Sequence, residues 1–149
     1  MEIHLVLIIR LQNKMFVTDC LVGTATFTPE SANHEADLKG KAGTLQLRAI
    51  AGLCNAAEFD AASAKLPLHE RIIFGDATDQ AILRLSESLG PVSDLRHLWK
   101  KTYELAFSSK NKFMIRTFSL AEPEGLGLAL SPAETQEFKQ ADAYVLMQT

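Results

Sequence analysis

Apolar and polar residues form separate blocks in the first part of the chain. Residues 4–9 and 15–22 are mostly β-branched or apolar, and a short polar stretch separates them. Runs of this length and composition predict two β-strands. The polar segment 29–43 contains two glycines and predicts an exposed loop. Apolar residues then recur at helical spacing, which predicts a helix over residues 44–59, before the pattern breaks at residues 60–68.

A second helix is predicted to begin just after a glycine. Gly75 favours a turn, and the carboxylate of Asp76 can cap the helix N-terminus. Apolar residues then line one face of this helix: Ile82, Leu85 and Leu89. Gly90 and Pro91 stand where a helix ends, and residues 93–99 predict a shorter helix.

The last part of the chain predicts more strands. Side chains alternate over residues 102–107 and 113–118, which predicts a β-hairpin connected by residues 108–111. Residues 121–141 contain prolines, glycines and a polar run, which predicts a surface insertion with one helical turn. Residues 144–147 predict the start of another strand.

Composition restricts the classes of protein to which the chain can belong. At 149 residues it is long enough for one domain with a buried core. Its 15 basic and 18 acidic residues leave a net charge of −3, and no basic block predicts a nucleic-acid partner. Cys20 and Cys54 lie far apart without a C-x-x-C motif, so we expect reduced, buried thiols of the kind found in cytosolic proteins.

The sequence predicts neither a membrane-spanning helix nor a metal site. The apolar run at residues 5–9 is far shorter than the roughly 20 residues that a membrane-spanning helix requires. It also lacks the basic start and cleavage site of a signal peptide. The four histidines are scattered and none has a second metal ligand at helical spacing, so we expect no bound metal.

Two segments carry the clearest chemical signal in the chain. Residues 75–81 read GDATDQA, and about 30 residues later residues 107–112 read FSSKNK. This pair resembles the nucleotide-binding domain of P-type cation-transporting ATPases, in the branch of the sodium/potassium and proton/potassium pumps, where the two segments flank the adenine of ATP. The resemblance covers residues 12–120 and implies an α+β fold in which an antiparallel β-sheet is flanked by helices.

At the helix start, the resemblance implies contacts with the base. Asp79 matches the acidic residue beside the adenine amino group, with Asp76 and Thr78 nearby. The pumps generally carry a longer glutamate at the position of Asp79, so this contact is expected to be stretched or to pass through water. The residues alone leave an alternative open, because an ordinary capped helix start has the same pattern.

In the hairpin, the resemblance implies the rest of the pocket. Phe107 matches the ring on which adenine stacks, and Lys112 matches the pocket lysine near the phosphates. Met114 stands where the pumps commonly have glutamine, so an apolar contact replaces a polar one and discrimination among bases should be weaker. The alternatives for Phe107 and Lys112 are a core aromatic residue and a solvated strand residue.

Other parts of the family pattern do not occur in this chain. The pumps phosphorylate the aspartate of a D-K-T-G-T-L-T-x-N-K-M segment, and residues 11–15 match only its tail. The later K-G-A-P-E segment is not found, nor is a phosphate-binding G-x-x-x-x-G-K-[ST] loop or a nucleophile elbow. We therefore expect residues 1–11 to be an extension from outside the family and residues 12–149 to be an incomplete nucleotide-binding domain.

The resemblance implies a domain that binds ATP on the cytoplasmic side of a membrane. In a whole pump this domain presents the γ-phosphate of Mg-ATP to an aspartate of another domain, so its partners are ATP and the phosphorylation and transmembrane domains, which this chain lacks. We expect the chain by itself to bind ATP at about millimolar concentration and not to hydrolyse it. The alternative is a non-catalytic scaffold that binds no nucleotide, with an open sheet edge that favours self-association.

Overall fold

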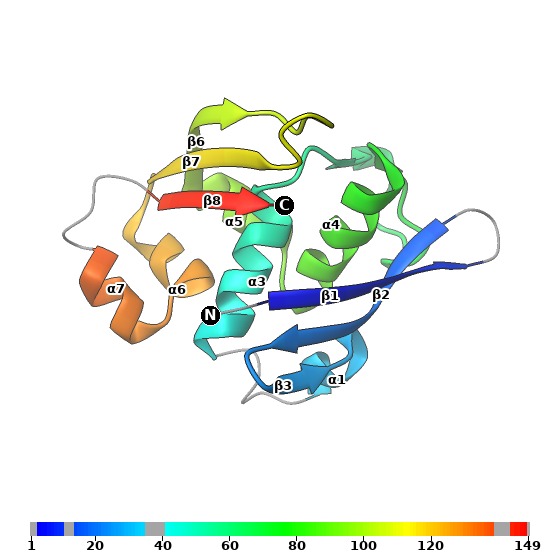
Figure 1. Cartoon of the computed structure of the whole chain (residues 1–149), viewed down its shortest axis with the longest axis horizontal. Helices are drawn as coiled ribbons and strands as arrows, with labels where there is room; N and C mark the ends of the chain where they lie inside the picture. Colours follow the sequence, from blue (N-terminus) through cyan, green and yellow to red (C-terminus); the bar gives the residue numbers. More distant parts are fainter. Residues whose placement is uncertain (1–2, 11–13, 35–40, 139–143, 149) are drawn as a thin grey trace.

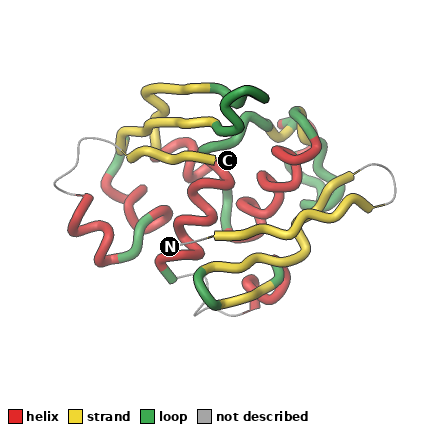
Figure 2. Tube along the Cα trace, in the orientation of Figure 1, coloured by secondary structure: helices red, strands yellow, loops and turns green. Residues whose placement is uncertain are grey.

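Two helices lie between two small antiparallel sheets, which makes the fold α+β, as predicted. The structure is a computed structural model that describes residues 3–10, 14–34, 41–138 and 144–148. In Figure 1, helices α3 and α4 run through the centre of the molecule with a three-stranded sheet above them and another below. Figure 2 shows the same layers coloured by the type of element. The two central helices are α3, Ala42–Leu53, and α4, Ala77–Leu89.

The first sheet contains both predicted N-terminal strands and a third strand. β1 pairs antiparallel with β2, and β2 pairs antiparallel with β3. The strands are β1 Ile3–Arg10, β2 Lys14–Val22 and β3 Ala25–Phe27. Gly23 takes the left-handed position, at φ +61°, in the turn between β2 and β3. The sequence pattern does not predict β3, because three residues are too few to show the period of a strand.

The prediction of a loop over residues 29–43 is wrong at both ends of this range. Its first residues form helix α1, Pro29–His34, and its last residues belong to α3. Thr28 and Ser31 cap α1 reciprocally, because each backbone N–H donates to the hydroxyl of the other residue, at 3.0 and 3.1 Å. The polar residues here are therefore a helix-start signal as well as a loop signal. Residues 35–40 lie outside the described residues.

Helix α3 ends at Leu53, before the boundary predicted at residue 59. The side chain of Asn55 turns the chain there, because its Oδ1 accepts a hydrogen bond from the Ala57 N–H at 2.8 Å. The residues that follow leave the helix and form a two-stranded ladder with a later segment. These elements are β4 Glu58–Phe59, the 3-10 helix η1 Ala61–Ser63, and β5 Ile73–Phe74.

The predicted hairpin forms the second sheet. β6 pairs antiparallel with β7, and β7 pairs antiparallel with β8. The elements are helix α5 Val92–Leu98 and strands β6 Trp99–Leu105, β7 Met114–Leu120 and β8 Tyr144–Gln148. On β7 one set of alternating side chains, Met114, Arg116 and Phe118, is buried. The sheet therefore covers the core with the face that carries these three residues.

In the segment predicted as a surface insertion, residues 121–141, the apolar side chains between residues 126 and 138 instead pack on the core. It forms three short helices, η2 Pro123–Gly125, α6 Leu126–Ala129 and α7 Pro132–Phe138. Trp99, which is 1% exposed, donates from its indole Nε1 to the Gly125 carbonyl at 2.9 Å and meets the Phe138 ring edge to face at 5.4 Å. The indole gives this glycine- and proline-rich segment an apolar partner that its own sequence pattern does not reveal. Residues 139–141 lie outside the described residues.

Buried apolar side chains of the described residues form three clusters, the smallest of which includes Ile73 and Leu83. Of the other two, one lies between α3 and the second sheet, around Leu53, Leu95 and Trp99, and the other joins the first sheet to α4 through Leu47 and Leu85. Cys20 and Cys54 are buried and unbridged, as predicted, and burial together with nearby Asp19 raises the pKa of the Cys20 thiol to about 12. In the described part of the chain, no helix has the length and apolar character needed to cross a membrane.

The contact between the two central helices depends on a glycine. A Cβ added at Gly52 of α3 would lie 2.5 Å from the Ser86 Oγ of α4, which donates to the Arg48 carbonyl at 2.9 Å. Gly52→Ala is therefore expected to destabilise the fold by about 1–3 kcal/mol, despite a gain of about 1 kcal/mol in helix propensity. Urea denaturation measures the change in the free energy of unfolding.

The matched control is the same substitution in a Ser86→Ala background. Without the hydroxyl, the nearest atoms to the Gly52→Ala side chain would be the Leu95 Cδ1 at 3.3 Å and the Cβ of residue 86 at 3.4 Å, so only a slight shift of Leu95 is needed. We expect the cost of Gly52→Ala to fall by at least about 1 kcal/mol there. An equal cost in both backgrounds would show that the contact with Ser86 does not limit the approach of the helices.

Candidate functional site

A cavity of about 720 Å³ lies between the start of α4 and the β6–β7 hairpin. The first wall comes from α4 and the loop after α3, and the second wall comes from β6, β7 and their connection. All six residues predicted as site residues line this one cavity, together with Ala56, Glu104 and Ala106. The full lining is Ala56, Asp76, Thr78, Asp79, Glu104, Ala106, Phe107, Lys112 and Met114.

The start of α4 is held by its own cap and by a glycine. The Asp76 Oδ1 accepts from the Asp79 N–H at 2.9 Å, so Asp76 is the N-cap residue that the sequence predicts. Gly75 has φ +132°, and a Cβ there would lie 2.9 Å from the Cβ of Ala57. Only glycine fits this turn, because a side chain would be strained by the backbone angle and would also collide with the neighbouring loop.

Asp79 is fixed on the cavity wall by contacts with the loop after α3. It is 8% exposed, its Oδ2 accepts from the Ala56 N–H at 3.2 Å, and its carbonyl accepts from the Asn55 Nδ2 at 2.9 Å. One of these bonds is to the side chain and the other to the backbone, so both the carboxylate and the first turn of α4 are held against this loop.

The hairpin wall combines an exposed ring, a lysine and a buried thioether. Phe107 is 58% exposed, which excludes the alternative that it is a core residue. Lys112 has φ +63°, and its N–H donates to the Ser108 carbonyl at 2.8 Å, which closes the connection between the strands. Met114 is 3% exposed and adds an apolar surface at the base of this wall. A flat polar ring could stack on Phe107 with its phosphate groups near Lys112.

Arg116, below the cavity, connects its two walls. Its Nη1 donates to the Leu53 carbonyl at 3.0 Å and the Asn55 carbonyl at 2.6 Å, and its Nη2 donates to the Glu104 Oε1 at 2.7 Å. Glu104 also forms an ion pair with Lys101. Hydrogen bonds from Lys101 and Arg116 hold the pKa of the Glu104 carboxyl below its ordinary value of 4.5.

The sequence motifs do not predict the Glu104–Arg116 ion pair. Arg116 occupies an inward position of an alternating strand, between the buried Met114 and Phe118. A charged residue at such a position is a signal in the sequence, because a buried guanidinium needs partners. No comparable signal marks Glu104, whose place beside the cavity depends on the register between β6 and β7.

The described residues contain no group of three or more histidine, cysteine, aspartate or glutamate side chains arranged to hold a metal ion. The site therefore consists of hydrogen-bonding groups, an aromatic ring and charges. Its chemistry suits binding and orientation of a ligand with a flat base and an anionic tail.

Comparison with known proteins identifies the family. The fold and cavity define an α+β domain with a cavity between a helix start and a β-hairpin, and the protein family described as P-type ATPase, cytoplasmic domain N, matches residues 44–130. The chain belongs to this family, as its two sequence segments predict. The matched range includes every residue that lines the cavity.

The relatives compared are alpha chains of sodium/potassium-transporting and potassium-transporting ATPases. The chain is 33% identical to the sodium/potassium-transporting ATPase subunit alpha-A of Artemia franciscana over 127 residues, which is 82% of this chain and 13% of that protein. It is 33% identical to potassium-transporting ATPase alpha chain 2 of Cavia porcellus over 116 residues, 75% of this chain and 11% of that protein. The corresponding human chain is 31% identical over 114 residues, 76% of this chain and 10% of that protein. The chain therefore spans only a small part of the length of these relatives.

The Glu104 ion pair predicts a pH dependence of stability. Because the folded-state pKa of Glu104 lies below its ordinary 4.5, the carboxylate stabilises the fold above that pH, and the contribution is lost as the pH falls through the folded-state pKa. Glu104→Gln should therefore destabilise the protein at pH 7 and have a smaller effect at about pH 3. Urea denaturation of both proteins at the two pH values measures this difference.

Glu122→Gln is the control for this measurement. Glu122 is exposed and has no ion pair among the described residues. Its substitution should change stability little at either pH. If Glu104→Gln had the same effect at both pH values, the ion pair with Arg116 and Lys101 would contribute nothing measurable.

Proposed function

We propose that the chain binds ATP in the cavity between α4 and the β6–β7 hairpin. The observation that carries this proposal is the convergence of a capped helix start, an exposed ring and a lysine on one cavity of about 720 Å³. The two contributing segments lie about 30 residues apart in the chain. A volume of this size is within the range of small-molecule sites and suits a nucleotide.

Each wall has a separate role in the proposed complex. The adenine stacks on Phe107 and rests against Met114, and its amino group donates to the Asp79 carboxylate, directly or through a water molecule. The phosphates extend toward Lys112, where an ammonium group favours anionic oxygens. Met114 offers the base an apolar contact, so we expect only weak discrimination between ATP and other nucleoside triphosphates.

In a complete pump, we propose that this domain positions ATP for phosphoryl transfer. ATP supplies the γ-phosphate and brings Mg²⁺ with it, and the acceptor is an aspartate of a neighbouring domain. The residues of this chain would hold the base and the tail so that the γ-phosphate lies at the domain boundary. We infer that the phosphorylation and transmembrane domains are its partners, that the parent protein transports cations, and that the chain alone does not hydrolyse ATP.

The extent of the domain is also a proposal. The family match covers residues 44–130, and we propose that the domain runs from residue 12 to residue 149 with residues 1–11 as an added extension. The pairing of β8 with β7 and the packing of β2 against α4 support the wider range. β1 would then add one strand to the edge of β2.

A second candidate function is a scaffold that associates through a sheet edge. Within the described residues, β6 and β8 are the edge strands of the second sheet. An edge strand can pair with another chain, although the charged residues of β6 oppose this. A nucleotide titration separates the two functions, because the scaffold would show no saturable binding of ATP.

Phe107→Ala is expected to weaken ATP binding. Loss of base stacking should cost about 1–3 kcal/mol, which raises the dissociation constant about 5-fold to 150-fold. The matched control is Phe74→Ala, because Phe74 is 61% exposed and lies outside the cavity lining. NMR titration of labelled protein measures both constants, and equal weakening by the two substitutions would refute the proposed stacking.

Lys112→Gln is expected to weaken ATP binding about 3-fold to 10-fold while leaving adenosine binding unchanged. The reason is that Lys112 acts on the phosphates and adenosine has none. The difference should shrink at high salt, because screening weakens an exposed charge. Lys110→Gln is the control, since Lys110 is exposed in the same connection but does not line the cavity. A parallel loss of adenosine binding would place Lys112 at the base instead.

A further inference from the structure

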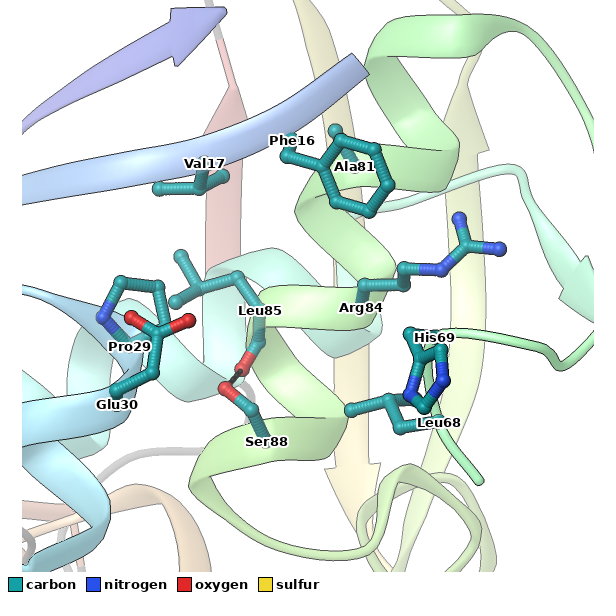
Figure 3. A pocket seen from close by; sticks show the side chains of 10 residues that line it. All are labelled: Phe16, Val17, Pro29, Glu30, Leu68, His69, Ala81, Arg84, Leu85 and Ser88. Atoms are coloured by element: carbon teal, nitrogen blue, oxygen red, sulfur yellow. Dashed lines mark hydrogen bonds between the residues drawn. The ribbon is translucent and has the colours of Figure 1, made fainter. Parts of the chain in front are cut away.

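A second cavity, of about 260 Å³, lies on another side of α4 (Figure 3). It is an open hollow lined by β2, the start of α1, the loop at residues 68–69 and the middle of α4, and it shares no lining residue with the proposed ATP cavity. An adjoining hollow of about 540 Å³ shares four of its lining residues. The lining common to both is Phe16, Val17, Glu30 and His69.

The guanidinium of Arg84 contributes a buried charge to this cavity. Arg84 is 8% exposed, its Nη2 donates to the Arg71 carbonyl at 2.8 Å, and its guanidinium lies 5.9 Å from the centre of the Phe16 ring. Its Nε has no hydrogen-bond partner, and among the described residues it has no carboxylate partner. Burial lowers the pKa of Arg84, because a charge out of water is costly unless it is paired. The unbonded Nε is covered by protein atoms, but the positive charge of this side chain, which lines the cavity, would attract an anionic group there.

The opposite side of the cavity carries acceptor groups. Glu30 and Ser88 lie on one side of the view in Figure 3, and Arg84 lies on the other side with His69. The Ser88 hydroxyl donates to the Leu85 carbonyl at 2.7 Å, so its oxygen can accept from a ligand. The adjoining hollow adds the carboxylate of Asp19.

Apolar surface separates these two polar sides. Leu85 lies between Glu30 and Arg84 in Figure 3, and Val17 and Phe16 lie along the β2 side of the same space. A purely anionic ligand would be repelled by Glu30, and a purely cationic one by Arg84. A ligand that carries both charges, separated by an apolar chain, would match all three surfaces.

We propose that this cavity binds a small zwitterion of the ω-amino carboxylic acid class, with its carboxylate at Arg84 and its ammonium at Glu30. The apolar chain of the ligand lies against Leu85 and Val17. The site is independent of the proposed ATP cavity, so it can be correct even if the chain binds no nucleotide.

Three related probes test the pairing of charges. 6-Aminohexanoate carries both charges, hexanoate carries only the carboxylate, and hexylamine carries only the ammonium. In an NMR titration of the full chain, 6-aminohexanoate should give saturable shifts of the Phe16, His69 and Arg84 amides and bind about tenfold or more tightly than either of the others. Absence of saturable shifts at these residues with 6-aminohexanoate up to about 50 mM would overturn the proposal.

Two substitutions test which side chain binds each end of the ligand. Arg84→Gln should reduce the affinity for 6-aminohexanoate to that for hexylamine, and Glu30→Gln should reduce it to that for hexanoate. Glu30 is exposed, so its variant keeps the test valid if Arg84→Gln fails to fold. Glu122→Gln is the matched carboxylate control outside the cavity and should leave the affinity unchanged. Binding that is unaffected by Glu30→Gln would overturn the proposed orientation.

Discussion

The buried hydrogen bonds of Arg116 are the constraint on which the proposed site depends. This side chain joins the second sheet to the end of α3 through the carbonyls of Leu53 and Asn55. The Asn55 amide then donates to the carbonyl of Asp79, so the same network reaches the first turn of α4. Both walls of the cavity are therefore joined by hydrogen bonds to the same short stretch of chain, residues 53–55. Partial loss of such a buried network is costly, because it leaves polar groups without partners.

Helix α4 lines both cavities, each with a different part of its length. Its first turn presents Asp79 to the proposed nucleotide site, and its middle presents Arg84 to the smaller cavity beside β2. The helix is anchored by buried apolar residues along its length and, after Arg84, by the close approach of Gly52 to Ser86. The helix can therefore serve as a rigid support for both groups of side chains, which favours accurate placement of a bound ligand.

The sequence predicts much of this architecture where the local signal is strong. The hairpin and the capped start of α4 follow from alternation and from the Gly75-Asp76 pair, and the six residues implied by the family resemblance line one cavity. Their roles in binding ATP stay a prediction. Tertiary contacts decide the parts that the sequence pattern misses. α3 ends early because Asn55 bonds to α4, and the segment after residue 120 packs inward because Trp99 holds it.

The Glu104–Arg116 pair and the smaller cavity could not be predicted from local patterns. Glu104 meets Arg116 through the register of neighbouring strands, and Arg84 meets β2 through packing of residues far apart in the chain. The inward position of Arg116 on β7 indicates that it needs partners, but no period or motif in the sequence identifies Glu104 as one of them or reveals the smaller cavity. Such sites become visible only when burial and partners are known for each charged side chain.

The most direct test of the central claim is the position of bound adenine. Intermolecular NOE spectra of the chain with ATP would report which protons lie near the H2 and H8 protons of the base. If adenine binds in the proposed cavity, both protons should lie near the Phe107 ring and the Met114 methyl group, which line it. Saturable ATP binding with contacts elsewhere and none to these two side chains would contradict this claim.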